Sequence, residues 1–455
     1  MSHGEPHPRR IEVLGAFESV YLPEHDIDVV ESTGHATRWR DDLLLLRSCG
    51  VRTLRYPVRW HRVEGEPGCF DWADTDRVLG WIADQGMSPI VDLVHHTSHP
   101  RWLRDGFADP RFGDAMLRYY EAFARRYPWV GAYTLFNEPF GTLFLCGSEG
   151  IYPPRLRGTG GFVEVVRNVL PAIGEGSRML RDLLPEARHV YVDTCERHSA
   201  ARPEAVAYTE YANDRRFVLI DLLLGRDLDP RRPFLHDLVE SGGEDLLDME
   251  PGHVDVLGLD YYAHSQWQFT GHRLGTGTSP CPGRLDDLIA EYWERYRLPV
   301  MLGETNIRGH PSDRASWLKY TLEQCESALA RGVPVQGYCW FPSIDSCDWG
   351  SLLNRADRAI DPVGVFWLDQ ALARHDSSMS RSFAMAAIGV PAAHLPAYRF
   401  RRPVLDWLRG YLPQMAHWDW QDPPDEPPCT NPPQRGEVIE FPVPPLPGGL
   451  PPGAA

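Results

Sequence analysis

The sequence has no long hydrophobic run. None of its apolar stretches approaches the roughly 20 residues that a transmembrane helix needs. The N-terminal stretch, MSHGEPHPRR, also has no apolar segment of the kind found in secretory signal peptides. Because neither signal is present, we expect a soluble protein that stays in the cytoplasm.

Cysteine and histidine are not arranged for metal binding. The nine cysteines are scattered, without a C-x-x-C pair, and their odd number suggests a reducing compartment rather than a disulfide framework. His95, His96 and His99 are close in the sequence. Neighbouring residues on a strand point to opposite faces, however, so His95 and His96 cannot bind one ion if the strand continues through them. We therefore expect no metal and no other cofactor.

Positive charge is in deficit. The chain has 46 Lys and Arg against 63 Asp and Glu, a net charge of −17. This charge argues against nucleic acid and anionic membranes as partners, and its main effect is solubility. The sequence leaves open whether the protein is a monomer or a homo-oligomer.

The chain also lacks a dinucleotide-binding fingerprint, since no G-x-G-x-x-G follows its first apolar run. What it does have is a regular alternation of short apolar runs with amphipathic stretches, which is typical of a parallel sheet covered by helices on both faces. Eight such units favour an α/β fold of the (β/α)8 TIM-barrel type with long loops on the C-terminal face. The predicted strands are 11–17, 52–58, 89–95, 132–136, 189–194, 255–262, 299–304 and 334–341. The predicted helices are 37–50, 73–86, 112–127, 161–184, 204–223, 284–297 and 313–332.

Two segments lie outside this alternation. Residues 342–400 form a long excursion ahead of a final helix predicted near 402–412. Residues 422–455 are so rich in proline that they form neither a helix nor a central strand, and they are either disordered or an extended surface strap. We therefore divide the chain into a barrel domain, 1–421, and a tail, 422–455.

One strand ends in an unusual way. The stretch TLFNEPF, residues 134–140, runs from apolar residues straight into Asn137, Glu138 and Pro139. A buried carboxylate is costly unless it is paired, and proline cannot continue a central strand. In a parallel barrel, polar residues at the C-terminal ends of strands form the active site. Glu138 is therefore a candidate catalytic residue.

A second glutamate, Glu304, ends the predicted strand 299–304. Two carboxyl groups that face each other across a site are what glycoside hydrolysis requires. One of them must be protonated, and the other must stay ionised with the help of donors, for which Arg55 and Tyr262 are candidates. Further polar or aromatic residues near the strand ends are His95, His96, Asn137, Asp260, Tyr261, Thr305, Asn306, Trp340, Asp345, Asp348 and Trp349.

These residues resemble motifs of glycoside hydrolase family 1, the β-glucosidase family of retaining (β/α)8-barrel enzymes. The resemblance covers about residues 11–350. Its segments are VRTLRYPVRWHRVEGEPGCFDW, GMSPIVDLVHHTSHPRWL, TLFNEP, VDVLGLDYY, LPVMLGETN and GYCWFPSIDSCDW. The resemblance implies a hydrolase of O-glycosyl bonds that uses double displacement, with Glu138 as acid/base and Glu304 as nucleophile. It further implies a glycoside substrate bound by Glu18, Arg55, His95, Asn137, Tyr262, Trp340, Asp348 and Trp349.

Several positions depart from the family pattern. Glu18 stands where the family usually has a glutamine, and His96 where it has a tryptophan. Asp348 precedes Trp349 in place of a glutamate, and residues 303–306 read Gly-Glu-Thr-Asn in place of Thr-Glu-Asn-Gly. We therefore expect the catalytic pair to be retained and the residues that read the sugar to differ.

Two other functions fit the same residues. A transglycosylase would use the same double displacement with an alcohol in place of water, and the sequence does not separate it from a hydrolase. A non-catalytic carbohydrate-binding barrel would not need two opposed carboxylates. Asp348 has a structural alternative as well, since its carboxylate could serve only its own loop.

Overall fold

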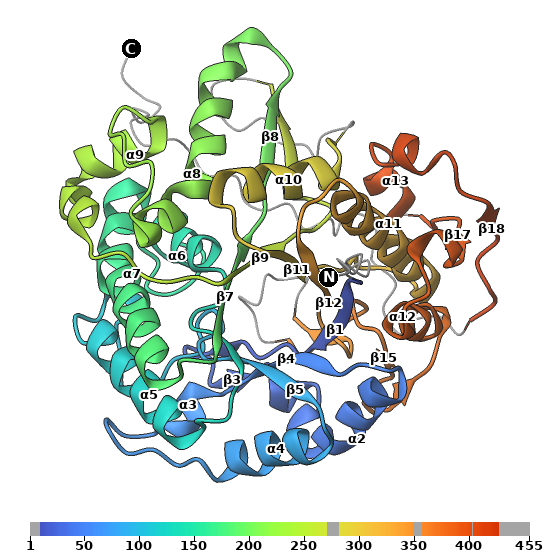
Figure 1. Ribbon diagram of the computed structural model, residues 1–455, viewed down its shortest axis with the longest axis horizontal. Coiled ribbons are helices and arrows are strands. Elements are labelled where there is room, and N and C mark those ends of the chain that lie inside the picture. The colour runs from blue at the N-terminus through green and yellow to red at the C-terminus, as the bar shows by residue number, and fades with distance from the viewer. Residues whose placement is uncertain (1–9, 271–281, 349–356, 403, 427–455) are drawn as a thin grey trace, which may run out of the picture.

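Eight parallel strands close into a barrel (Figure 1), which confirms the predicted fold class. The computed structural model describes residues 10–270, 282–348, 357–402 and 404–426. Around the barrel the strands follow each other in the order of the sequence, and each predicted apolar run overlaps one of them. They are β1 (Glu12–Ala16), β4 (Thr53–Pro57), β5 (Ser88–Asp92), β6 (Ala132–Thr134), β7 (Arg188–Thr194), β9 (Val256–Asp260), β11 (Val300–Glu304) and β12 (Val335–Trp340).

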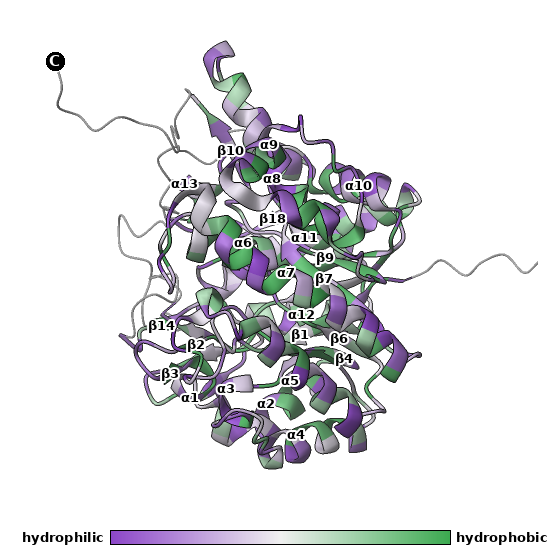
Figure 2. Cartoon of the chain, turned by 90° about the vertical axis from the view of Figure 1, so that its left-hand side faces the viewer, coloured by the Kyte–Doolittle hydropathy of each residue, from purple (hydrophilic) through white to green (hydrophobic). Residues whose placement is uncertain are grey.

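A ring of helices surrounds the barrel (Figure 1) because each helix has one apolar face to bury. Helix α5 (Phe112–Arg126) is an example, since it buries Met116, Tyr120 and Phe123 on one side. Figure 2 shows hydrophilic and hydrophobic residues alternating along the helices of this ring. The other long helices are α2 (His35–Ser48), α4 (Ala73–Asp84), α7 (Gly158–Leu183), α8 (Val206–Leu224), α10 (Leu285–Tyr296) and α11 (Pro311–Ala330), all near the predicted ranges.

The inside of the barrel has its own apolar cluster, separate from the core between barrel and helices. Its members come from six of the eight strands or the residues just after them, and are Leu14, Ala16, Ile90, Val190, Val192, Val256, Met301, Cys339 and Phe341. Side chains thus fill the barrel, and the polar residues at the strand ends lie at its C-terminal edge.

The eighth helix of the ring is not where the sequence predicted it. Residues 404–408 form only a short helix, α13 (Val404–Leu408), whereas α12 (Ser378–Ile388) lies inside the predicted excursion and packs against α11 and β1. Helix α12 was missed because short strand pairs, β13 (Ser346–Cys347) with β14 (Ile360–Asp361) and β15 (Trp367–Leu368) with β16 (Arg374–His375), separate it from the barrel.

Two further findings concern the described residues. None of their helices is long and apolar enough to cross a membrane. Their seven cysteines are all free thiols, and all but Cys69 are buried. Most of the Pro-rich tail, 427–455, lies outside the described residues.

The described start of the tail suggests a truncation experiment. The Glu426 carboxylate accepts hydrogen bonds from the Ser378 backbone N–H at 2.5 Å and from the Ser378 hydroxyl at 2.9 Å, at the first turn of α12. A chain cut after residue 426 should keep the melting temperature of the full chain. A chain cut after residue 421 should have a free energy of unfolding about 1 kcal/mol lower, which is the usual cost of losing a helix cap, and a correspondingly lower melting temperature. Calorimetry of both truncations, with Glu426→Ala in the full chain as the matched variant, checks this. Equal melting temperatures for the two truncations would contradict it.

Candidate active site

Glu138 lies between the end of β6 and helix α6 (Pro139–Gly147). Its backbone N–H donates to the Val192 carbonyl of β7 at 2.9 Å, and the helix starts at once with Pro139. To make this turn, Glu138 adopts a left-handed conformation with φ 46° and ψ 61°, which is uncommon for a residue other than glycine. This geometry takes the side chain out of the strand pattern and into the mouth of the barrel.

Asp193 of β7 holds the start of α6 in place. Its carboxylate accepts hydrogen bonds from the backbone N–H groups of Phe140 at 2.9 Å and Gly141 at 3.3 Å. The Tyr191 hydroxyl donates to it at 2.8 Å. Burial raises the pKa of Asp193 to about 6, although these hydrogen bonds oppose the shift. Asp193 therefore fixes the turn that carries Glu138.

Glu304 is the last residue of β11, is 2% exposed and has both predicted partners. Arg55 of β4 donates to its Oε1 at 2.7 Å, and the Tyr262 hydroxyl donates to its Oε2 at 2.9 Å. Both oxygens of the carboxylate therefore accept a hydrogen bond, and one of the two donors is a cation.

Arg55 connects Glu304 to the neighbouring strand ends. It donates to the side-chain amide oxygen of Asn137 at 2.6 Å and to the Asp92 carboxylate at 3.2 Å. Asp92 in turn lies 2.8 Å from Nδ1 of His95, whose Nε2 is 3.3 Å from Glu18. The structure thus joins Arg55, Asn137, His95 and Glu18 in one buried network, although the sequence did not identify Asp92 as its link.

Two histidines in this network differ in charge. Burial opposes protonation of His95, but the carboxylates of Asp92 and Glu18 raise its pKa to about 10. Burial and the charge of His95 lower the pKa of His96 to about 3. His96 Nε2 lies 3.8 Å from Glu138, and its Nδ1 lies 2.8 Å from the Thr142 hydroxyl. A neutral imidazole thus lies beside Glu138 and a cationic one beside Glu18.

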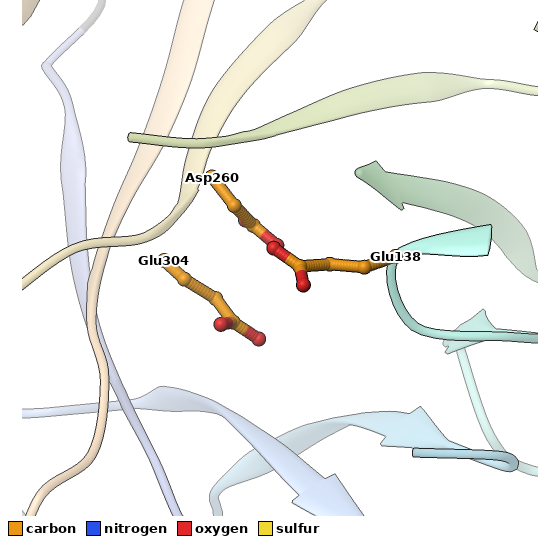
Figure 3. A group of neighbouring side chains, drawn as sticks. All are labelled: Glu138, Asp260 and Glu304. Atoms are coloured by element: carbon orange, nitrogen blue, oxygen red, sulfur yellow. The ribbon is translucent and has the colours of Figure 1, made fainter. Parts of the chain in front are cut away.

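Glu138 and Glu304 face each other together with a third carboxyl group, that of Asp260 at the end of β9 (Figure 3). One carboxylate oxygen from each of the three lies within 4.8 Å of those of the other two. Burial raises the pKa of Glu138, and the negative charges of Glu304 and Asp193 add to the shift. Burial likewise raises the pKa of Asp260, assisted by Glu304 and Glu138. The site therefore combines a carboxyl group whose pKa is raised with a second one that accepts hydrogen bonds from Arg55 and Tyr262.

The remaining predicted residues lie differently. The Trp340 ring is fully buried, and its Nε1 donates to the Val363 carbonyl at 3.0 Å. Asp348 accepts backbone N–H groups of Asp357, Arg358 and Ala359 at 3.0 to 3.2 Å, which favours its structural alternative. Trp349 lies outside the described residues. Sugar contacts of these three residues stay predictions.

Sequence reasoning missed three acidic residues of the site. Asp260 was counted among the polar strand ends but received no role, and Asp92 and Asp193 were not singled out. Asp92 ends β5 and Asp193 is the penultimate residue of β7, so the available signal was their position at the end of an apolar run.

Comparison with known proteins shows which proteins this chain is similar to. No protein-family model matches the chain. β-Glucosidase A of Thermotoga maritima is 21% identical over 355 residues, covering 69% of this chain and 78% of that protein. The chain is a divergent relative of glycoside hydrolase family 1. An aryl-phospho-β-D-glucosidase of Bacillus subtilis is 22% identical over 69% of this chain and 78% of its own length.

Solved structures of this family share the barrel. The β-glucosidase from Thermotoga maritima in complex with azafagomine superimposes with a TM-score of 0.70 at 18% identity, covering 85% of this chain and 99% of that one. Its complex with castanospermine gives a TM-score of 0.71 at 17% identity, with the same coverage. At this identity the likeness supports the fold, and the roles of individual residues depend on the geometry of the site.

Asp193 can be tested by its effect on stability. Asp193→Ala leaves two buried N–H groups and a buried hydroxyl without an acceptor, so it should lower the free energy of unfolding by roughly 2–4 kcal/mol. Because the folded pKa is raised to about 6, the wild type loses stability between the unfolded pKa of about 3.9 and that value. The deficit of the variant should therefore be largest below about pH 4 and shrink up to about pH 6. Urea unfolding across this range measures it, and a deficit that grows with pH would contradict the assignment.

Proposed function

We propose that the protein is a retaining β-glycosidase that hydrolyses a β-linked glycoside by double displacement. The curated relatives support a glycoside hydrolase of the β-glucosidase type. The observation that carries the proposal is the opposed pair Glu138 and Glu304, one with a raised pKa and the other with Arg55 and Tyr262 as donors. Retaining enzymes hold their carboxyl groups about 5–5.5 Å apart and inverting ones about 6.5–9.5 Å. One oxygen of Glu138 lies within 4.8 Å of one oxygen of Glu304, so the two carboxyl groups face each other in one site, as the double displacement requires.

In the first step, Glu304 attacks the anomeric carbon while Glu138 gives its proton to the departing glycosidic oxygen. A covalent glycosyl ester of Glu304 forms, and the leaving group departs as an alcohol. Arg55 and Tyr262 orient the attacking carboxylate. Burial and the negative charge of Glu304 raise the pKa of Glu138, which favours the protonated form that this step needs.

In the second step, Glu138 is ionised and acts as the base. It takes a proton from a water molecule, whose oxygen attacks the anomeric carbon and releases Glu304. The product keeps the configuration of the substrate, and Glu138 regains its proton. Neither step requires a group other than the side chains of this chain and water.

The sugar-binding side of the pocket is proposed from the same network. Asn137, His95 and Glu18 are buried polar residues at neighbouring strand ends, so their free hydrogen-bonding capacity is suited to sugar hydroxyls. The Asn137 side-chain nitrogen is one of the buried polar atoms that have no hydrogen-bond partner among the described residues. Because Glu18 and His96 depart from the family pattern, we do not assign glucose as the sugar.

Transglycosylation by the same mechanism is the second candidate. A galactolipid galactosyltransferase of Arabidopsis thaliana is 24% identical over 68% of this chain and 52% of its own length. Whether water or another alcohol attacks the glycosyl ester depends on access to the second half of the site. Analysis of products formed with and without added alcohol distinguishes the two reactions. A cytoplasmic location remains a prediction of the sequence.

Replacement of each glutamate separately tests the mechanism. Glu304→Ala should lower turnover of every glycoside by roughly 10⁴-fold or more, because all substrates need the attacking carboxylate. Glu138→Ala should lower turnover of alkyl glycosides by roughly 10²–10⁴-fold. It should spare the first step for dinitrophenyl glycosides, because dinitrophenolate departs without needing a proton. Azide should rescue Glu138→Ala and give a glycosyl azide of retained configuration, and in Glu304→Ala it should give the inverted product. NMR of the azide products reads the configuration.

Glu291→Ala is the matched control, because Glu291 is half-exposed on the outer helix α10, where it pairs with Arg216. This variant should keep wild-type turnover. If the wild type cleaves a glycoside and neither Glu138→Ala nor Glu304→Ala slows it, the catalytic site lies elsewhere.

A further inference from the structure

Asp260 is a buried carboxyl group that has no hydrogen-bond donor among the described residues. It is 1% exposed, and neither Oδ1 nor Oδ2 accepts a hydrogen bond from an N–H or O–H group. Its side chain points at Glu138, with one oxygen of Glu138 next to it and the other directed away (Figure 3). Asp260 therefore faces two other acids at close range and no donor.

The fold makes room for this group. A Cβ atom on Gly303 would lie 2.5 Å from Oδ1 of Asp260, closer than two such atoms can approach. Gly303 directly precedes Glu304, and it is one of the positions at which the chain departs from the family pattern, with glycine in place of threonine. The small residue at 303 and the acid at 260 thus fit each other.

A buried ionised carboxylate without a donor would be very costly. Two adjacent carboxyl groups avoid this cost by sharing a proton, because they cannot both ionise at such short range. We propose that Asp260 carries a proton that it donates in a hydrogen bond to Glu138, so that the two acids titrate as one pair. Asp260 is then a positioning residue for the acid/base, and this inference rests on the function proposed above.

Other charged and titratable groups face this pair from the surrounding strand ends. Glu304 adds negative charge and favours protonation of both acids, while Arg55 opposes protonation of Asp260 and His95 opposes that of Glu138. Among the described residues, the charged and titratable groups around the pair are Arg55, His95, His96, Tyr152, Asp193, Tyr262 and Glu304. Since Arg55 already donates to Glu304, Asn137 and Asp92, it does not replace the proton between the two acids.

The pair changes what Glu138 can do. When the shared proton passes through Glu138 to the leaving oxygen, Glu304 loses its negative charge by forming the ester, so the total charge of the three acids is unchanged. In the second step, Glu138 takes a proton from water, this proton is again shared with Asp260, and Glu304 regains its charge. As the pH rises, the pair loses its protons in two separated steps. One proton therefore remains available at pH values at which a lone carboxyl group would have lost its own.

The first test is the pH profile of Asp260→Asn. With an alkyl β-glycoside, whose leaving group needs a proton, the basic limb of kcat/KM should move to lower pH by about one unit or more. With a dinitrophenyl glycoside, which needs no proton in this step, the limb should move little. If Asp260 had only a structural role, its replacement would affect the basic limb of kcat/KM equally for both substrates.

Asp255→Asn is the matched control, because Asp255 directly precedes the first residue of the same strand, at the far end of the barrel from the site. Its pH profile should equal that of the wild type. Asp260→Ala is the second variant, in case the asparagine variant does not fold, and it should move the basic limb in the same direction.

A second measurement does not depend on turnover. A proton shared by Asp260 and Glu138 gives an infrared carbonyl band of a protonated carboxylic acid at neutral pH, and in Asp260→Asn this band should disappear at a lower pH than in the wild type. Because the raised pKa makes the wild type lose stability above the unfolded pKa of about 3.9, Asp260→Asn should also gain stability relative to the wild type as the pH rises. A wild-type spectrum without that band, or a stability difference independent of pH, would overturn the inference.

Failure of the proposed function and binding of a cation can each be distinguished from failure of this inference. If the wild type cleaves no glycoside, the proposed function fails, while the infrared test of the proton still stands. A divalent cation between the three carboxylates would be an alternative to the proton. Loss of activity in EDTA that added Mg²⁺ or Ca²⁺ restores would overturn the shared proton, whereas an unchanged pH profile in EDTA supports it.

Discussion

The hydrogen bonds of Arg55 at the mouth of the barrel are the constraint on which the rest of the site depends. A guanidinium that is 2% exposed must have its charge balanced and its donors satisfied. Glu304 and Asp92 balance its charge, and with Asn137 they accept hydrogen bonds from its two terminal nitrogens; the three residues come from the ends of three other strands. Arg55 therefore fixes how these strand ends lie relative to one another. The hydrogen bond from Arg55 orients the carboxylate of Glu304.

Around Arg55 the balance of charge is negative. Glu304 and Asp92 share its positive charge, His95 carries a second one between Asp92 and Glu18, and Glu138 and Asp260 have no cation of their own. An excess of buried carboxyl groups over cations is resolved by protons, which is the state that an acid catalyst needs. The same excess that makes the site costly to fold thus prepares it for proton transfer.

The barrel and the site tolerate divergence to different degrees. Identity to the relatives is close to 20%, yet most of the barrel superimposes. Apolar strands and amphipathic helices keep their pattern through many substitutions, because a buried position requires only an apolar side chain of suitable size. Contacts such as that between Arg55 and Glu304 ask for particular atoms at particular distances. Gly303 departs from the family pattern, and it leaves room for the carboxyl group of Asp260.

The sequence by itself determined the barrel, its eight strands and the opposed pair of glutamates. These follow from local signals: the length and spacing of apolar runs, and a carboxylate directly at the end of one. The helix α12 escaped prediction, because intervening strand pairs hid its place in the ring. Only the tertiary structure decided that Asp92 joins Arg55 to His95, that Asp193 fixes the turn at Glu138, and that Asp260 meets Glu138 without a donor. These contacts join residues up to about 120 positions apart in the sequence, and their energies depend on burial and distance, which no local pattern of residues contains.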